Sequence, residues 1–215
     1  MSPILTSIVT AVGGILAGLA LAAVLLWRQQ QALTRARYAA EHDDTTGLPN
    51  RRALLAAVGR AAQRGTPFGL VLLDLDSFKA INDTLGHEAG NDVLTEVGRR
   101  LAALRAPVRL AARLSGDEFA LLVDGNRDDV AAVARAAWRA VGRDPVDLGA
   151  HALAVRASVG HTSAALGVSL RTLLHQADTA MYQAKQTGTG VRGATATTGH
   201  TRPLPGTRPR DLHRR

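Results

Sequence analysis

The spacing of hydrophobic and polar residues after residue 42 predicts alternating helices and strands. Apolar residues recur at helical intervals over residues 50–64, whereas residues 68–74 (FGLVLLD) form the short apolar run that is typical of a buried strand. The same reasoning predicts a helical turn over 78–85 and a long helix over 88–104, followed by two strands over 108–114 and 119–123. A helix over 128–142, a strand over 153–159 and a helix over 169–186 complete the series. From the first strand on, this β-α-β-β-α-β order predicts an α+β fold of ferredoxin-like type, with an antiparallel or mixed sheet and helices packed on one face.

The N-terminal segment is apolar over a longer stretch. Residues 4–27 contain no charged side chain, and as a helix rising ~1.5 Å per residue they would extend about 36 Å, enough to cross a bilayer. A secretory signal peptide is the alternative, but its apolar core usually has only ~7–15 residues and follows a basic region that is absent here. Residues 1–27 are therefore predicted to be a transmembrane anchor, and the arginines that follow predict a single-pass protein of the cell membrane with a cytoplasmic catalytic domain.

The segments next to the expected domain have simple predicted structures. Residues 28–42 lack helix breakers and are predicted to form a polar linker helix leading to a domain over residues 43–190. Residues 191–215 are rich in Gly, Thr, Pro and Arg and are predicted to be a disordered basic tail. Gly14 and Gly18 stand at small-xxx-small spacing, which could bring two anchor helices together.

Composition narrows the classes of function. The chain has no Cys, which excludes disulfides, a thiolate nucleophile and Cys-ligated metals, so a bound metal would need oxygen or imidazole ligands. A formal charge of +8 suggests nucleic-acid binding until the charge is divided by segment. Residues 38–191 hold 17 basic and 17 acidic residues, because the excess of arginine lies in the two flanks. This neutral region offers no face for a phosphate backbone, so no nucleic-acid partner is expected.

Three acidic residues stand at predicted strand ends. Asp74 ends an apolar strand, and Asp117 and Glu118 lie in the turn of the expected hairpin, where Gly116 permits a tight backbone. If these strands are neighbours in the sheet, the three carboxylates converge on one edge and repel one another. Mg²⁺ would remove the repulsion, since it binds a few carboxylates together with substrate phosphate oxygens, and such sites serve phosphoryl transfer. Taken singly, each acid is better explained as a turn cap.

Four motifs, in this order, resemble those of the GGDEF family of nucleotidyl cyclases. Residues 43–52 (DDTTGLPNRR) are similar to its opening DxLTGLxNRR, and residues 73–87 (LDLDSFKAINDTLGH) are similar to its DxDxFKxIND…GH segment. Residues 115–119 (SGDEF) stand at the signature, and residues 177–185 (ADTAMYQAK) resemble the closing ADxALYxAK helix. The resemblance covers roughly residues 42–190 and implies a sheet of the nucleotidyl-cyclase type.

The resemblance implies diguanylate cyclase activity. Two GTP molecules, one on each half of a head-to-head homodimer, would be joined to cyclic di-GMP with release of pyrophosphate. Two Mg²⁺ (or Mn²⁺) ions per active half-site would be held by Asp74, the Leu75 carbonyl, Asp117 and Glu118. Asp74, Asp117 and Glu118 are thereby the expected catalytic residues, with Asp117 as the base for the attacking hydroxyl.

The resemblance also implies residues that bind the substrate. Lys185 would meet the terminal phosphates as a point charge, and the backbone of Ser77 and Phe78 would add hydrogen-bond donors. Asn82 would read the guanine edge, as would the residue at position 91, which is Asn91 here. Gly116 would leave space for the nucleotide to lie against the hairpin.

The chain departs from the family pattern at several positions. Ser115 replaces the first Gly of the signature, and this small residue leaves the hairpin possible. Asn91 stands where the family has the Asp that accepts hydrogen bonds from guanine, an exchange expected to cost ~1–3 kcal/mol in discrimination. Thr189 replaces an Arg that holds phosphate. The RxxD product-inhibition motif is absent, because its two ends are Ala106 and Arg109.

Two hypotheses follow from these features. In the first, the protein is an active diguanylate cyclase in contact with the lipid bilayer through residues 4–27, which the retained acidic residues and lysine favour. In the second, it is a catalytically weak GGDEF module that binds nucleotide or a partner protein as a regulator, which the exchanges at positions 91 and 189 favour.

Overall fold

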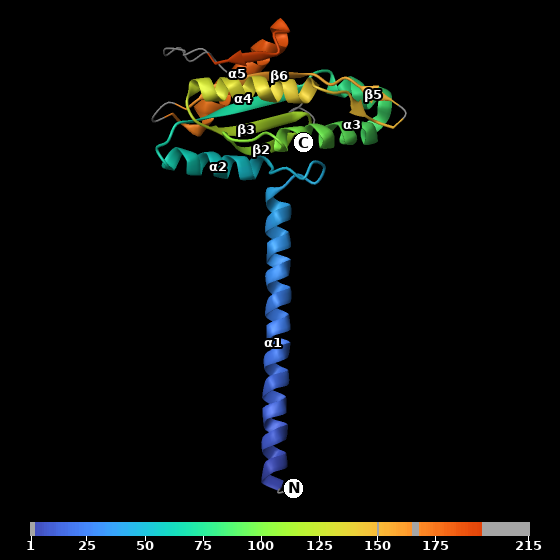
Figure 1. The fold of residues 1–215 in the computed structure, drawn as a ribbon, viewed down its shortest axis with the longest axis vertical. Coiled ribbons are helices and arrows are strands. Elements are labelled where there is room, and N and C mark those ends of the chain that lie inside the picture. The colour runs from blue at the N-terminus through green and yellow to red at the C-terminus, as the bar shows by residue number, and fades with distance from the viewer. Residues whose placement is uncertain (1–2, 150, 165–167, 195–215) are drawn as a thin grey trace, which may run out of the picture.

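A computed structural model describes residues 3–149, 151–164 and 168–194, and of residues 4–13, 15, 17 and 37 it describes the backbone alone. Five strands form one sheet in the order β2-β3-β1-β6-β7 (Figure 1). The strands are β1 Phe68–Leu75, β2 Val108–Ser115, β3 Glu118–Asp124, β6 Ala157–Ser163 and β7 Val191–Gly193. A separate small sheet pairs β4 Val146–Asp147 with β5 Ala152–Leu153. The helices are α1 Pro3–Glu41, α2 Arg51–Gln63, α3 Phe78–Ala102, α4 Arg127–Gly142 and α5 Leu170–Thr187.

The main sheet is mixed, as the sequence predicts. The central strand β1 pairs antiparallel with β3 on one side and with β6 on the other. The hairpin of β2 and β3 is antiparallel, and β7 runs parallel to β6 at the opposite edge. Strands β2, β3, β1 and β6 therefore have the predicted ferredoxin-like order, and β7 extends it.

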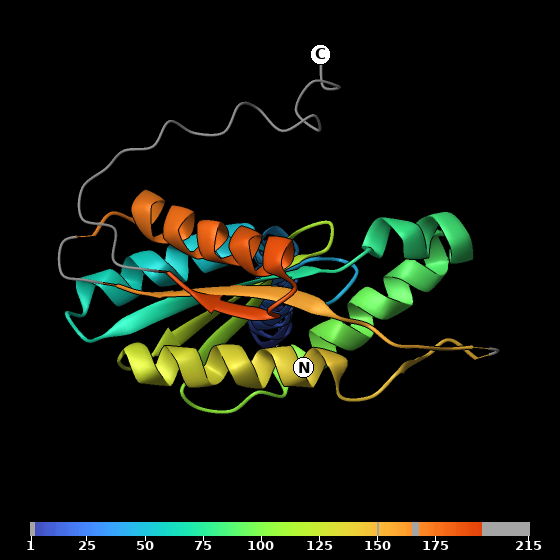
Figure 2. The same cartoon turned by 90° about the horizontal axis from the view of Figure 1, so that it is seen from above.

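Helices cover both faces of the sheet, so the predicted single helical face is wrong. Figure 2 shows α4 (yellow) and α5 (orange) on opposite sides of the strands. Because successive side chains of a strand point to opposite faces, β1 contributes Val71 and Leu73 to a core shared with α3 and α4. It contributes Leu70 and Leu72 to a second core shared with α2 and α5. Burial on both faces is the reason that β1 is an unbroken apolar run.

Two predictions near the end of the folded region are also wrong. The expected strand over residues 153–159 is divided, because β5 ends at Leu153 and β6 begins only at Ala157. Residues 191–193, which the sequence assigns to a disordered tail, form β7 and pair with β6. The three residues of β7 are too few to give a periodic pattern. The remainder of the predicted tail, residues 195–215, lies outside the described residues.

Helix α1 is continuous across the predicted boundary between anchor and linker helix (Figure 1). Its large apolar side chains from residue 16 to residue 27 are exposed: Leu16, Leu19, Leu21, Val24, Leu25, Leu26 and Trp27. Within the part of the chain that it describes, the structure has no helix of sufficient length and apolar character to cross a membrane. The predicted transmembrane anchor therefore finds no support there, and the side chains of residues 4–13, 15 and 17 lie outside the described part.

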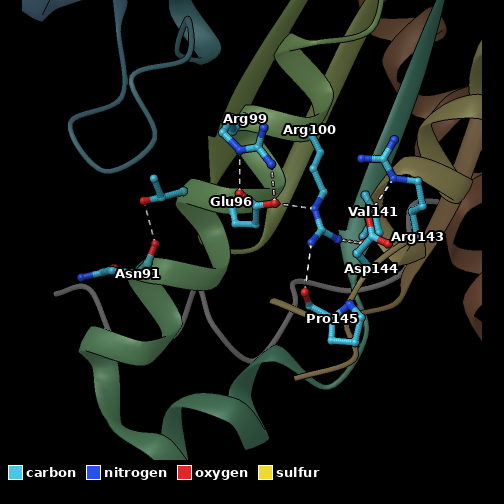
Figure 3. A network of polar contacts seen from close by, with 9 residues as sticks. Asn91, Glu96, Arg99, Arg100, Val141, Arg143, Asp144 and Pro145 are labelled. Atoms are coloured by element: carbon cyan, nitrogen blue, oxygen red, sulfur yellow. Dashed lines mark hydrogen bonds and ion pairs between the residues drawn. The ribbon is translucent and has the colours of Figure 1, made fainter. Parts of the chain in front are cut away.

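Helix α3 unites the predicted helical turn and the long helix that follows it. The two parts meet at a kink at Gly86, whose φ of +87° is not helical and suits a residue without a side chain. The second part is fixed to α4 by Arg100, whose guanidinium donates to Glu96 Oε1 at 2.8 Å and to the carbonyl of Val141 at 2.7 Å (Figure 3). Since the last carbonyls of a helix have no partner within it, Arg100 caps the end of α4.

Candidate functional site

The ends of β1 and β3 bring the predicted acidic residues to one edge of the sheet. Asp74 is paired in register with Glu118, and the N–H of Leu75 donates to the carbonyl of Asp117 at 3.2 Å. Asp117 is buried although it belongs to a turn, with 9% of its surface exposed. The adjacency of β1 and β3, on which the predicted convergence of the three carboxylates depends, is thus confirmed.

The hairpin turn is held in place by Arg113, which sequence reasoning missed. Gly116 has a φ of +52°, and a Cβ added to it would meet nothing within 4 Å, so the space beside the turn is open. Arg113 Nε donates to the Gly116 carbonyl at 2.9 Å, and Arg113 Nη1 donates to Asp43 Oδ1 at 2.8 Å. The Ser115 hydroxyl donates to Glu118 Oε2 at 3.2 Å, a contact that the family's glycine cannot make.

Asp43 connects this hairpin to the turn that follows α1. Partial burial acts to raise the pKa of Asp43, but hydrogen bonds from Arg113 and Thr46 outweigh it and lower the pKa. The carboxylate is therefore ionised at neutral pH and pairs with the Arg113 guanidinium. The signal for Arg113 in the sequence was a charged side chain within the otherwise apolar run over residues 110–114.

Lys185 reaches the same edge from α5. Its ammonium group forms an ion pair with the Asp74 carboxylate. Helix α5 lies close on the sheet because Gly160 of β6 has no side chain: a Cβ there would come within 2.2 Å of the Ala177 carbonyl oxygen and the Met181 nitrogen. This close packing sets the position from which Lys185 extends.

Two residues separate the end of β1 from the start of α3. Ser77, in the left-handed region with a φ of +58°, precedes the helix and makes no capping hydrogen bond with its side chain. A helix N-terminus without a side-chain cap leaves backbone N–H groups that favour an anion. Asp76 has a structural role here, because its carboxylate accepts a hydrogen bond from the Ser158 hydroxyl at 2.8 Å. The predicted donors Ser77 and Phe78 are therefore next to the acidic edge.

The kink in α3 brings the two predicted guanine-reading positions into one region. A Cβ added to Gly90 would lie 1.9 Å from Asn82 Oδ1, so the Asn82 side chain lies against the helix immediately before Asn91. Asn82 Oδ1 is buried and has no hydrogen-bond partner within the described residues. A buried acceptor without a partner is costly, and a ligand that donates a hydrogen bond would remove that cost. Asn91 itself is exposed.

The three acidic residues that the sequence predicts as Mg²⁺ ligands share one edge of the sheet. Among the residues that the structure describes, no three His, Asp or Glu side chains are arranged to hold a metal ion. Asp74 is instead paired with Lys185. The donors at this edge still fit Mg²⁺ in kind, since Asp74, Asp117, Glu118 and the Leu75 carbonyl are all hard oxygen ligands.

A cavity of about 300 Å³ lies between α2, the sheet and α5. Its polar lining residues are Arg51, Glu118, His175 and Asp178, and leucines form most of the remainder. Glu118 is the single predicted site residue in this lining, so the cavity does not coincide with the region of Asn82 and Asn91.

Comparisons with known proteins agree with this geometry. Residues 40–190 match the family described as "Diguanylate cyclase, GGDEF domain". The chain is 39% identical over 190 residues to an uncharacterized signaling protein of Caulobacter vibrioides, covering 81% of this chain and 22% of the relative. It is 35% identical over 150 residues to the diguanylate cyclase DgcS of Shewanella oneidensis, covering 68% of this chain and 50% of the relative.

Solved structures give the same result. The coiled coil and GGDEF domain of DgcB from Caulobacter crescentus, in complex with c-di-GMP, is similar with a TM-score of 0.75 at 30% identity, covering 83% of this chain and 98% of that one. Diguanylate cyclase SiaD of Pseudomonas aeruginosa, in complex with its activator SiaC, has a TM-score of 0.69 at 34% identity, covering 88% of this chain and 76% of that one. The chain spans only about a quarter of the length of several curated relatives. With the family match over most of its length, the chain belongs to the GGDEF family.

Proposed function

We propose that the protein is a diguanylate cyclase, which condenses two GTP molecules into cyclic di-GMP and releases pyrophosphate. The observation that carries this proposal is the meeting of Asp74, Glu118 and Lys185 at the edge where the hairpin presents Asp117. Family membership supports the same reaction. In-line attack of a 3′-hydroxyl on an α-phosphate needs positioning and charge neutralisation more than covalent help from the protein.

The acidic residues have the metal-binding and proton-accepting roles. Asp74, the Leu75 carbonyl, Asp117 and Glu118 would hold Mg²⁺ ions, two per half-site, which would neutralise phosphate charge when bound. Asp117 accepts the proton of the attacking 3′-hydroxyl. Little of Asp117 is exposed, and Arg113 fixes the backbone of the turn that carries it.

The remaining residues bind and orient GTP. Lys185 binds the terminal phosphates, and the backbone N–H groups at Ser77 and Phe78 bind phosphate oxygens at the start of α3. Asn82, whose buried oxygen lacks a partner within the described residues, accepts a hydrogen bond from the guanine edge. Asn91 reads the same base, and open space at Gly116 accommodates the nucleotide.

The assembly follows from the chemistry. One half-site presents one GTP, so turnover requires a homodimer in which two sites face each other. The uncharged residues 4–27 and the exposed leucines of α1 support attachment to the cell membrane, with the catalytic domain in the cytoplasm. Fractionation of expressing cells tests the location: the full chain should sediment with membranes and detergent should release it.

The second candidate is a weak cyclase that acts as a nucleotide-binding regulator. Asn91 favours it, because its amide does not match guanine as well as a carboxylate does. Thr189 favours it as well, since its side chain carries no charge for phosphate.

The proposal is tested by incubating the purified full chain with GTP and Mg²⁺ and analysing the products by mass spectrometry. An active cyclase yields cyclic di-GMP and pyrophosphate in a molar ratio of one to two. Binding of GTP without product, at every protein concentration tried, would favour the regulator.

A further inference from the structure

The Asp74 carboxylate already has a cation in this structure. Lys185 Nζ contacts Asp74 Oδ1, and the Asp74 side chain is only 16% exposed. The Lys185 side chain is 47% exposed, so its ammonium group can be solvated or can turn toward a ligand. The pair is thus asymmetric, with a fixed anion and a movable cation.

We propose that Lys185 is the counter-ion of Asp74 in the nucleotide-free protein, and that it competes with the divalent cation for this carboxylate until the nucleotide binds. The inference rests on the proposed function and concerns the order of binding. An ammonium group and a divalent cation on one carboxylate repel each other, so Lys185 must leave Asp74 when a metal ion binds there.

The nucleotide gives Lys185 another anion to bind. Without it, a departing ammonium group would lose its ion pair and gain only water. With it, the terminal phosphates take Lys185 while Asp74 takes the metal, so both cations keep an anionic partner. Because Thr189 is uncharged, Lys185 has no cationic neighbour at that position to share this role.

This exchange predicts opposite effects of one substitution. Lys185→Met removes the competing ammonium group and keeps the carboxylates of Asp74 and Glu118. It should therefore strengthen metal binding in the absence of nucleotide. The same substitution removes a phosphate ligand, and it should weaken the binding of GTP. A lysine that served the substrate alone would produce only the second effect.

The test is a titration of Mn²⁺ into the purified full chain in detergent, followed by the electron paramagnetic resonance signal of the free ion, with and without a non-hydrolysable GTP analogue. Without analogue, Lys185→Met should bind Mn²⁺ about three- to tenfold more tightly than the unaltered protein. With analogue, the variant should bind nucleotide more weakly. Lys185→Gln should behave in the same way, which guards against a misfolded single variant.

Two controls assign the effect to this ion pair. Lys79→Met removes the other lysine of the chain, which is exposed on the first turn of α3 and forms no ion pair among the described residues, and it should leave Mn²⁺ affinity without nucleotide unchanged. Adding Asp74→Asn to Lys185→Met should cancel the gain.

Equal Mn²⁺ affinities of the unaltered protein and Lys185→Met, without nucleotide, would overturn the inference. If the unaltered protein still made cyclic di-GMP from GTP, the proposed function would stand without it. Failure of the proposed function would instead appear as absence of product, whereas the titration without nucleotide tests the ion pair in either case.

Discussion

Two cations of this molecule, Arg100 and Lys185, lie in contrasting surroundings. Arg100 is 6% exposed and donates to Glu96, to the Val141 carbonyl and to the Pro145 carbonyl (Figure 3). Lys185 is half-exposed and pairs with Asp74. A buried guanidinium with several acceptors is costly to unpair, whereas a half-exposed ammonium can exchange its partner at small cost. Burial and the number of partners thus separate a charge that holds the fold from one that is available to a ligand.

Among the residues that are available to a ligand, the largest effect on product formation is expected for Asp117→Ala. We expect product formation to fall roughly a hundred- to ten-thousandfold, because the variant lacks the carboxylate that accepts the proton and holds metal. The free energy of unfolding should change by less than about 1 kcal/mol, because the hydrogen bonds from Leu75 and Arg113 that hold the turn end on backbone carbonyls, which the substitution keeps. Rates come from chromatography of cyclic di-GMP and stability from urea unfolding.

Asp144→Ala is the matched control, because Asp144 is an exposed acid that pairs with Arg143 away from the site. It should leave the rate unchanged. Turnover by Asp117→Ala near that of the unaltered protein would show that the hairpin acid is not part of the machinery.

A smaller effect is expected at the base-reading position. Asn91→Asp restores an acceptor for the guanine N1–H and amino groups and should raise the preference for GTP over ATP about tenfold. The measurement is the ratio of kcat/KM for the two nucleotides. Asn91→Ser, which removes the amide without adding a carboxylate, should not raise the ratio. An unchanged ratio in Asn91→Asp would mean that this position does not contact the base.

The smallest effect is expected for Glu96, which pairs with Arg100 and stabilises the fold. Hydrogen bonds from Arg99 and Arg100 lower the pKa of Glu96 from its ordinary value of 4.5 to about 2. Because the pKa of Glu96 is lower in the folded protein, its stabilising contribution is present above pH 4.5 and is lost as the pH falls toward 2. Glu96→Gln should lower the free energy of unfolding by about 1 kcal/mol at pH 7. In Glu96→Gln the free energy of unfolding should also fall less steeply as the pH is lowered from 4.5 toward 2. An equally steep fall in the variant and the unaltered protein would contradict the role of Glu96.

Much of the fold could be predicted from local patterns. The helices and strands between residues 50 and 142 have clear periodicity, and the positions of Asp74 and Glu118 at strand ends indicated a shared edge. The layers could not be predicted in the same way. The apolar run of β1 indicates a buried strand, but the sheet was expected to carry helices on one face, and both faces are covered. Strand β7 depends on pairing with β6 rather than on its own three residues.

The sequence predicted which residues belong to the site better than it predicted the contacts between them. Arg113 pairs with Asp43 across 70 positions, and Lys185 pairs with Asp74 across 111. Motifs place these residues in a common region, but the choice of partner depends on how α5 and the first turn pack on the sheet. The pairing of Lys185 with Asp74, which closes the expected metal site, therefore became visible only in three dimensions.

The most direct test of the contrast measures product formation and urea unfolding on the same preparations of Lys185→Met and Arg100→Met. We predict that Arg100→Met loses about 3 kcal/mol of stability, since it removes the hydrogen bonds that a buried guanidinium donates to Glu96, Val141 and Pro145. It should keep its turnover per folded molecule. Lys185→Met should keep its stability within about 1 kcal/mol and lose most of its turnover. If Lys185→Met were instead the destabilised variant with normal turnover, Lys185 would hold the fold and the assignment of the site would be contradicted.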